Sequence, residues 1–137
     1  MGAKHRISEI KNIIIVEDDA VQRKVVRHSL QDNANYNLIE FSDGQDALDY
    51  LRDNHKTVDL LILDYILPKM NGIDILRCLK KSESQFIFPV IMLTTKVEAK
   101  GSEIKDLNVV SWIIKPIPEN RWPDIVKKIF EIYPKES

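Results

Sequence analysis

The chain has 137 residues, a formal net charge of −1 and a hydrophobic content of 44%. This length fits a single domain, and the balanced charge argues against a nucleic-acid binder that works by bulk positive charge. One cysteine, Cys78, excludes a disulfide framework and a cysteine-based zinc site. No apolar run reaches the length of a membrane span, and the first residues lack a signal-peptide core, so we expect a cytoplasmic protein without membrane insertion.

Short apolar runs alternate with longer amphipathic stretches along the chain. Most of the runs are β-branched and unalternated, which is typical of strands covered on both faces, and the longer stretches have helical periodicity. In chain order we expect strands over 12–16, 37–41, 58–64, 88–95 and 111–115, each followed by a helix, over 20–32, 42–53, 71–82, 97–107 and 122–133.

Three of the expected helices have distinctive features. The helix over 42–53 begins with Ser42 and Gln45 at capping-box spacing. The helix over 97–107 is the weakest, because Gly101 interrupts it and few large apolar residues anchor it. The last helix is the clearest, with apolar residues at helical spacing that we expect in the core: Trp122, Ile125, Val126, Ile129, Phe130 and Tyr133.

Strands and helices that alternate within one small domain indicate an α/β fold in which helices cover both faces of a parallel sheet. We expect a flavodoxin-like, doubly wound sheet of five parallel strands in the order 2-1-3-4-5, with five helices. The domain should span residues 12–133, after an N-terminal lead-in at 1–11 and before a tail at 134–137.

Polar residues terminate four of the five expected strands. In open parallel sheets, ligands bind at the carboxyl ends of the strands, near the switch in strand order. The second strand ends in Phe41 and Ser42, and the order 2-1-3-4-5 places it on the outer edge of the sheet, remote from such a site. The other strands end in Glu17, Asp18 and Asp19, in Asp64, in Thr94 and Thr95, and in Lys115.

The acids at these strand ends outnumber the cations. Glu17, Asp18 and Asp64 set three negative charges against Lys115, and like charges about 4 Å apart repel by roughly 4 kcal/mol at an effective dielectric near 20. Either a carboxylate is protonated or a metal is bound there. Oxygen-only ligands in small number suit Mg²⁺. A metal and a lysine around a carboxylate, with a hydroxyl nearby, suit phosphoryl transfer onto that carboxylate.

Four motifs, VEDD, LDYILPKMNG, MLTT and WIIKP, resemble in order and spacing those of the receiver domain of two-component response regulators. The resemblance covers about 12–133 and, within the family, is greatest to single-domain chemotaxis regulators of the CheY type. It implies a module that accepts a phosphoryl group from a sensor histidine kinase or a phosphotransfer protein, with autodephosphorylation but no dedicated substrate turnover. It also implies an unidentified protein target and a monomer or weak phosphorylation-dependent dimer.

The resemblance also implies roles for individual residues. Asp64 would be the phosphoacceptor, Thr94 would hydrogen-bond the phosphoryl group and Lys115 would pair with it. Mg²⁺ would be held by Glu17, Asp18, Asp64 and the backbone carbonyl of Ile66.

The switch and its surroundings follow from the same resemblance. Thr94 and Trp112 would respond to phosphorylation, and a cis peptide before Pro116 would orient Lys115. The output face would comprise the fourth helix, the fifth strand and the fifth helix. Asp19 is better explained as a helix N-cap than as a metal ligand.

Three other classes of function compete with this interpretation. A Mg²⁺-dependent phosphohydrolase with an aspartyl nucleophile would need that aspartate on the first strand in a D-x-D arrangement, which VEDD does not supply. A flavin or nucleotide carrier would need a glycine-rich loop after Val16, and none follows. A scaffold with a degenerate site is disfavoured by the intact set Asp18, Asp64, Thr94 and Lys115. A phosphorelay intermediate, or a receiver fragment of a larger regulator, stays open.

Overall fold

The computed structural model describes residues 9–82, 86–95 and 106–133. Strands and helices alternate in these ranges except between the fourth and fifth strands, and all five expected strands are present close to their predicted bounds. The fourth expected helix, 97–107, lies outside the described residues except for its last two positions. None of the described helices is long and apolar enough to cross a membrane. The elements are β1 (Lys11–Val16), α2 (Ala20–Leu30), β2 (Tyr36–Phe41), α3 (Gly44–Asn54), η1 (His55–Thr57), β3 (Leu60–Asp64), α4 (Gly72–Lys81), β4 (Val90–Thr94), β5 (Val109–Ile114), η2 (Glu119–Arg121) and α6 (Trp122–Ile132).

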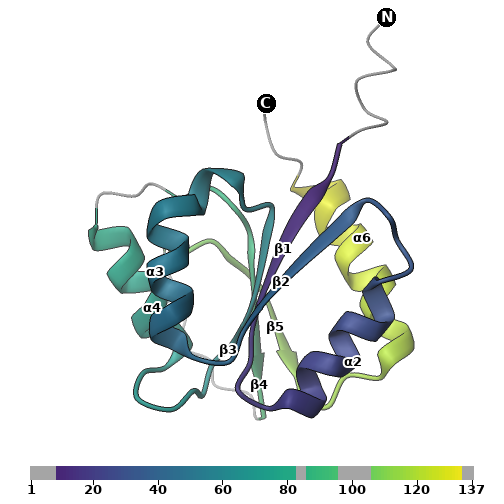
Figure 1. Ribbon diagram of the computed structural model, residues 1–137, viewed down its shortest axis with the longest axis horizontal. Coiled ribbons are helices and arrows are strands. Elements are labelled where there is room, and N and C mark those ends of the chain that lie inside the picture. Colours follow the sequence, from purple (N-terminus) through teal and green to yellow (C-terminus); the bar gives the residue numbers. More distant parts are fainter. Residues whose placement is uncertain (1–8, 83–85, 96–105, 134–137) are drawn as a thin grey trace, which may run out of the picture.

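The strands form one parallel sheet in the order β2-β1-β3-β4-β5, which confirms the expected topology. Helices α3 and α4 cover one face of the sheet, and α2 and α6 cover the other (Figure 1). Strand β2 lies at the edge, as its less apolar sequence predicted. Because all five strands are parallel, their carboxyl ends lie at one rim of the sheet, with the end of β2 at its outer edge.

Strand β1 shows why an unalternated apolar run forms a central strand. Ile14 and Val16 pack with the core under α3 and α4, while Ile13 and Ile15 pack with the core under α2 and α6. All four side chains are fully buried, and each contributes about 1.5–3 kcal/mol by leaving water. The two-sided core fixes the register of β1, because a slip by one residue would exchange its two faces.

The start of α3 differs from the predicted capping box. The N-cap is Asp43, one residue after Ser42, and its side chain accepts hydrogen bonds from the backbone N–H groups of Gln45 and Asp46. A carboxylate at this position also suits the positive end of the helix dipole. The predicted Ser42–Gln45 box is therefore wrong, and the helix begins at Gly44 rather than at the predicted residue 42.

The predicted apolar stripe of the last helix is buried over most of its length. Trp122, Val126 and Ile129 are buried against β1, β3 and β4 residues, and Phe130 stacks obliquely on Tyr36. Tyr133 is an exception, because α6 ends at Ile132 and 42% of Tyr133 is exposed. The expectation that Tyr133 belongs to the core is wrong.

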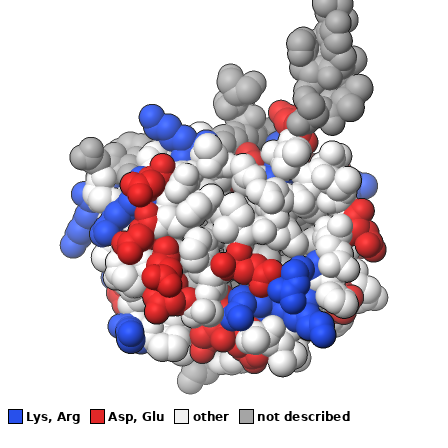
Figure 2. Space-filling view, in the orientation of Figure 1, with Lys and Arg blue, Asp and Glu red and all other residues white. Residues whose placement is uncertain are grey.

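Charged side chains of both signs share the surface in Figure 2. Acidic side chains gather over α3, and basic side chains lie over α2 beside a further acidic patch. Among the described residues, this face carries no continuous basic surface of the kind that binds nucleic acid by bulk charge.

Candidate functional site

Three carboxylates meet at the rim of the sheet. Val16 at the end of β1 pairs with Leu63 of β3. This pairing brings Glu17, which follows Val16, beside Asp64, which follows Leu63. One carboxylate oxygen from each of Glu17, Asp18 and Asp64 lies within 4.8 Å of the others. Glu17 and Asp64 are 2% and 3% exposed, whereas Asp18 is open to solvent. The predicted acidic cluster is therefore assembled by the fold.

Lys115 supplies the positive charge of this site. It follows β5 directly, and its ammonium group lies 3.0 Å from Asp64 Oδ2 and 3.1 Å from Glu17 Oε1. Its side chain is 14% exposed, so both ion pairs are shielded from water and salt. One lysine thus joins the carboxylates that end β1 and β3.

The electrostatics of the cluster leave it short of positive charge. Burial is the largest cause that raises the pKa of Glu17, and the hydrogen bond and the repulsion between Glu17 and Asp64 also raise it. The hydrogen bonds that Glu17 accepts from the N–H of Asp19 and from Lys115 lower it, and the resulting pKa is about 7. Burial alone would lower the pKa of Lys115, but hydrogen bonds and attraction to Asp64 and Glu17 outweigh it, so that pKa is raised. Glu17 therefore holds a proton part of the time near neutral pH unless another cation enters.

The donor set fits Mg²⁺. Glu17, Asp18 and Asp64 offer only carboxylate oxygens, close enough to face one ion, and Mg²⁺ takes one or two carboxylates and keeps several waters. A divalent cation would neutralise the charge that Lys115 leaves uncompensated. The backbone carbonyl of Ile66 stays a predicted further ligand; the Ile66 side chain is 60% exposed in the loop between β3 and α4.

The remaining predicted site residues lie around this cluster. Thr94 is 2% exposed at the end of β4, next to the register partner of Asp64, and its carbonyl accepts a 2.7 Å hydrogen bond from the N–H of Lys115. The Lys115–Pro116 peptide is cis, as expected. Trp112 is half-buried and meets the ring of Tyr65 edge-on, with centroids 5.5 Å apart. Tyr65 follows Asp64 in the chain, so the ring that Trp112 contacts belongs to the residue next to the predicted phosphoacceptor.

Two residues that support the site were missed from the sequence. A Cβ on Gly72 would lie 2.8 Å from the carbonyl oxygen of Asp64, so only glycine allows α4 to start this close to β3. Arg23 donates a 2.7 Å hydrogen bond to the carbonyl of Glu17. The PKMNG turn gave a signal for Gly72, but an arginine inside a helix gave none for this contact.

A flavodoxin-like sheet with an acid cluster and a lysine at its carboxyl rim defines the receiver class of signalling domains. The family model for the response regulator receiver domain matches residues 13–127. The chain therefore belongs to the response regulator receiver family, as its motifs predicted.

Individual response regulators are similar to this chain in sequence or in structure. The chain is 33% identical to chemotaxis protein CheY of Pseudomonas aeruginosa over 122 residues, which cover 87% of this chain and 95% of CheY. It is 39% identical to the Escherichia coli transcriptional regulatory protein CpxR over 95 residues, 69% of this chain but 36% of CpxR. Among solved structures, the phosphorylated cyanobacterial phytochrome response regulator RcpA superposes with a TM-score of 0.73 at 28% identity, over 90% of this chain and 94% of RcpA.

Proposed function

We propose that this protein is a phosphorylation-switched signalling module in which Asp64 accepts a phosphoryl group in a Mg²⁺-dependent reaction. The observation that carries the proposal is the buried Asp64 carboxylate, 3.0 Å from Lys115 and clustered with Glu17 and Asp18. A cluster of this kind is costly to bury, and the function explains its presence.

Phosphoryl transfer needs positioning and charge stabilisation more than covalent catalysis. An Asp64 oxygen attacks phosphorus, the P–N bond to a donor's phosphohistidine breaks, and the bonding electrons stay on the donor's imidazole. Bound Mg²⁺ supplies neutralisation of the phosphoryl oxygens. Lys115 pairs with an oxygen of the transferred group, and the Thr94 hydroxyl donates a hydrogen bond to another. The donor is a sensor histidine kinase or phosphotransfer protein, and the exchange takes place in the cytoplasm.

The lifetime of the phosphoryl group on Asp64 distinguishes the proposed function from a phosphohydrolase. A phosphohydrolase would release the group from this carboxylate at every turnover, whereas a receiver keeps the acyl phosphate long enough to signal. Slow autodephosphorylation without dedicated substrate turnover is the expected behaviour. The match to a segment of CpxR also fits a receiver that operates as part of a larger regulator.

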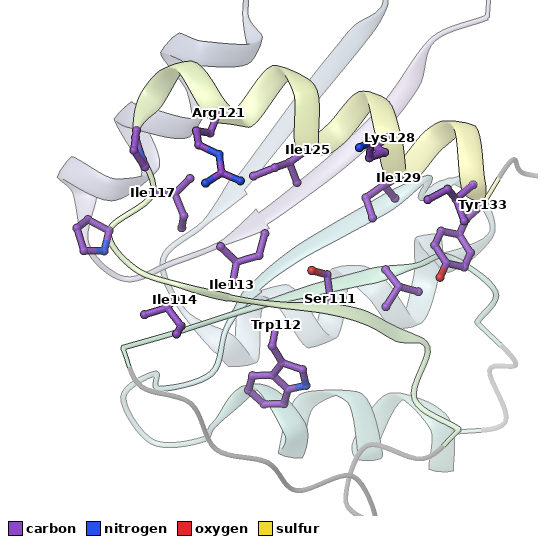
Figure 3. A pocket seen from close by; sticks show the side chains of 14 residues that line it. Ser111, Trp112, Ile113, Ile114, Ile117, Arg121, Ile125, Lys128, Ile129 and Tyr133 are labelled. Atoms are coloured by element: carbon purple, nitrogen blue, oxygen red, sulfur yellow. The ribbon is translucent and has the colours of Figure 1, made fainter.

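A groove beside β5 and α6 is the described part of the proposed output face. It has a volume of about 580 Å³, and its lining includes the exposed Ile114, Ile132 and Tyr133 together with Arg121 and Lys128 (Figure 3). Trp112 projects from β5, the strand that also carries Ile114 (Figure 3). The fourth helix, the other part of this face, lies outside the described residues. The target is a protein that docks on this face after phosphorylation, and the chain is a monomer or a weak phosphorylation-dependent dimer.

The chemistry is tested by intact-mass measurement after incubation with acetyl phosphate. Wild type should gain one phosphoryl group when Mg²⁺ is present and little when Mg²⁺ is chelated, because the carboxylates then repel the donor. Asp64→Asn, which keeps the shape but removes the nucleophile, should gain none. Equal labelling of both proteins would refute Asp64 as the phosphoacceptor.

The switch is tested by fluorescence with beryllofluoride and Mg²⁺, which mimic the phosphoryl group. The chain has two tryptophans, so Trp122→Phe, a change in the buried core, isolates the signal of Trp112. We expect the emission of Trp112 to shift and amide exchange in β5 to change, with neither response in Asp64→Asn. Flat signals from a protein that demonstrably binds the mimic would refute this output face.

A further inference from the structure

The loop between β1 and α2 carries two of the three carboxylates. Hydrogen bonds hold the backbone where the loop leaves β1 and where it enters α2. The N–H of Glu17 donates to the carbonyl of Phe41 at 3.0 Å, which extends the pairing of β1 with β2 by one residue. Asp19 caps α2 by accepting from the N–H of Val21 at 2.8 Å, as its sequence position predicted. These bonds leave the peptide group between Glu17 and Asp18 to be held by something else.

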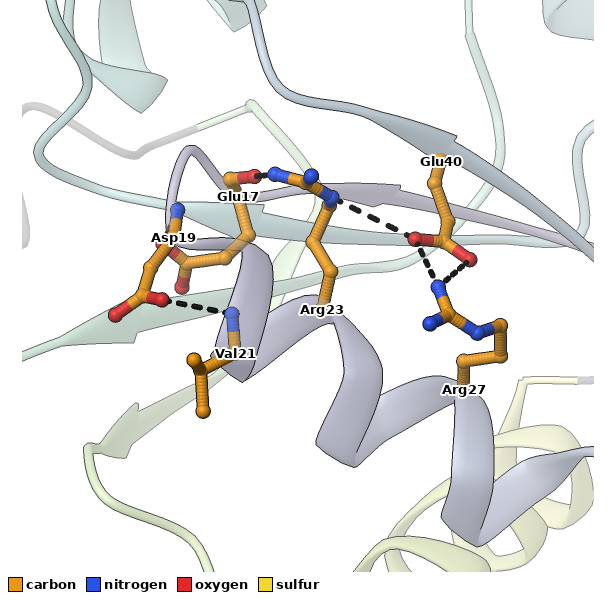
Figure 4. A network of polar contacts seen from close by, with 6 residues as sticks. All are labelled: Glu17, Asp19, Val21, Arg23, Arg27 and Glu40. Carbon is orange, nitrogen blue, oxygen red and sulfur yellow. Dashed lines mark hydrogen bonds and ion pairs between the residues drawn. The ribbon is translucent and has the colours of Figure 1, made fainter.

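Arg23 holds that peptide group. Its Nη1 donates a 2.7 Å hydrogen bond to the carbonyl of Glu17, the oxygen of the peptide that joins Glu17 to Asp18. Figure 4 shows the guanidinium reaching back from α2 to this carbonyl while its other side faces Glu40. The Nε of Arg23 is 3.5 Å from Glu40 Oε1. The guanidinium is therefore held at two places, and its planar fork fixes the direction of the bond to the carbonyl.

Glu40 is itself held by Arg27. Arg27 Nη1 lies 2.8 Å from one carboxylate oxygen of Glu40 and 2.7 Å from the other (Figure 4). Glu40 belongs to β2, the edge strand that contributes no residue to the acid cluster. Through Glu40 and Arg23, this strand is connected to the backbone of the acidic loop.

We propose that Arg23 is a positioning residue for the magnesium site. It fixes the plane of the 17–18 peptide, and the side chains of Glu17 and Asp18 project from the two ends of that peptide. Without this bond the peptide can rotate, and the two carboxylates no longer face the same point as Asp64. The inference rests on the proposed function, because Mg²⁺ is the ion that the carboxylates are positioned to bind.

The direction in which Mg²⁺ affinity changes when Arg23 is replaced distinguishes a positioning role from an effect of charge alone. Arg23 is a cation near a cation site, so if Coulomb repulsion alone acted, removal of Arg23 would strengthen Mg²⁺ binding. Positioning predicts the opposite. Residues that orient metal ligands typically change metal affinity by 10–100-fold when they are replaced, so Arg23→Met should raise the dissociation constant for Mg²⁺ about tenfold.

The experiment is a Mg²⁺ titration by calorimetry of the full chain and three variants. Arg23→Met keeps the apolar stem and removes the donor. Arg23→Lys keeps the charge but reaches only one of the two acceptors, and should show an intermediate loss. Lys24→Met is the matched control, because it removes an exposed charge from the same helical turn without a contact to Glu17; its affinity should stay within about twofold of wild type.

A second readout needs no metal. In Mg²⁺-free protein, Arg23→Met should speed amide hydrogen exchange at Asp18, Asp19 and Ala20, while exchange within β3 stays unchanged. If Arg23→Met does not fold, Arg23→Lys carries the test, and wild-type affinity in that variant would overturn the inference.

The outcomes distinguish this inference from the proposed function. Unchanged or tighter Mg²⁺ binding by folded Arg23→Met, with normal binding by wild type, overturns the positioning role alone. Absence of Mg²⁺ binding by wild type overturns the proposed function and this inference with it.

Discussion

Replacing Lys115 by methionine removes the positive charge that joins Asp64 to Glu17 and keeps the apolar stem of the side chain. At the observed separations of 3.0 and 3.1 Å, each pair is attracted by roughly 5 kcal/mol at an effective dielectric near 20. Much of this attraction offsets the cost of desolvation, and breaking a buried pair typically costs about 3–5 kcal/mol. We expect Lys115→Met to lose this amount of unfolding free energy at pH 8 without Mg²⁺.

The loss should depend on pH and on metal. At pH 5.5 Glu17 can take up a proton, because its pKa in the folded wild type is already about 7, so the destabilisation by Lys115→Met should be smaller than at pH 8. Mg²⁺ should restore part of the stability and bind more tightly than to wild type, since no ammonium competes for the carboxylates. Labelling by acetyl phosphate should nevertheless fall, because the partner of the phosphoryl oxygen is gone.

Thermal unfolding followed by circular dichroism measures these effects. For a domain of this size, about 1 kcal/mol corresponds to roughly 3–4 °C, so the expected drop at pH 8 is on the order of 10 °C. Lys127→Met, which removes an exposed lysine of α6, should melt within about 2 °C of wild type. If Lys115→Met melts as close to wild type as this control does, the two ion pairs do not stabilise the fold and the reasoning fails.

Two further predictions follow from the site. Because the folded-state pKa of Glu17, about 7, exceeds its ordinary value of 4.5, the folded protein binds the proton more tightly and Glu17's contribution to stability falls as pH rises from about 4.5 to 7. Denaturant unfolding without Mg²⁺ should show a smaller fall in Glu17→Gln than in wild type; equal falls would contradict the assignment. Gly72→Ala should cost about 1–3 kcal/mol and slow phosphorylation, because the new methyl group presses on the carbonyl of Asp64; wild-type stability and labelling would show that this contact relaxes freely.

The sheet and the acid cluster could be predicted from the sequence because they rest on local patterns with a simple spatial consequence. Unalternated apolar runs indicated buried strands, and parallel strands bring their carboxyl ends to one rim, so Glu17 and Asp64, at the ends of neighbouring strands, were expected to approach one another. Lys115 follows the edge strand β5, and its long side chain reaches both carboxylates. The burial of Glu17 and Asp64 confirms this reasoning.

The details that could not be predicted depend on single turns and on contacts between elements. Ser42 and Asp43 are both good N-cap residues, and the chain direction after β2, which is set by packing, selects Asp43. The bond of Arg23 to the Glu17 carbonyl depends on how α2 is rotated against β1. No spacing rule within the sequence contains that rotation, so Arg23 could be found only in the structure.

Trapping the phosphorylated carboxylate by reduction identifies the acid that accepts the phosphoryl group. Borohydride reduces an aspartyl phosphate to homoserine and leaves free carboxylates unchanged, so peptide mass spectrometry after acetyl phosphate, Mg²⁺ and borohydride shows which acid carried the group. We expect homoserine at position 64 and none when Mg²⁺ is chelated. Homoserine at position 18, or no reduction anywhere in a protein that binds Mg²⁺, would contradict it.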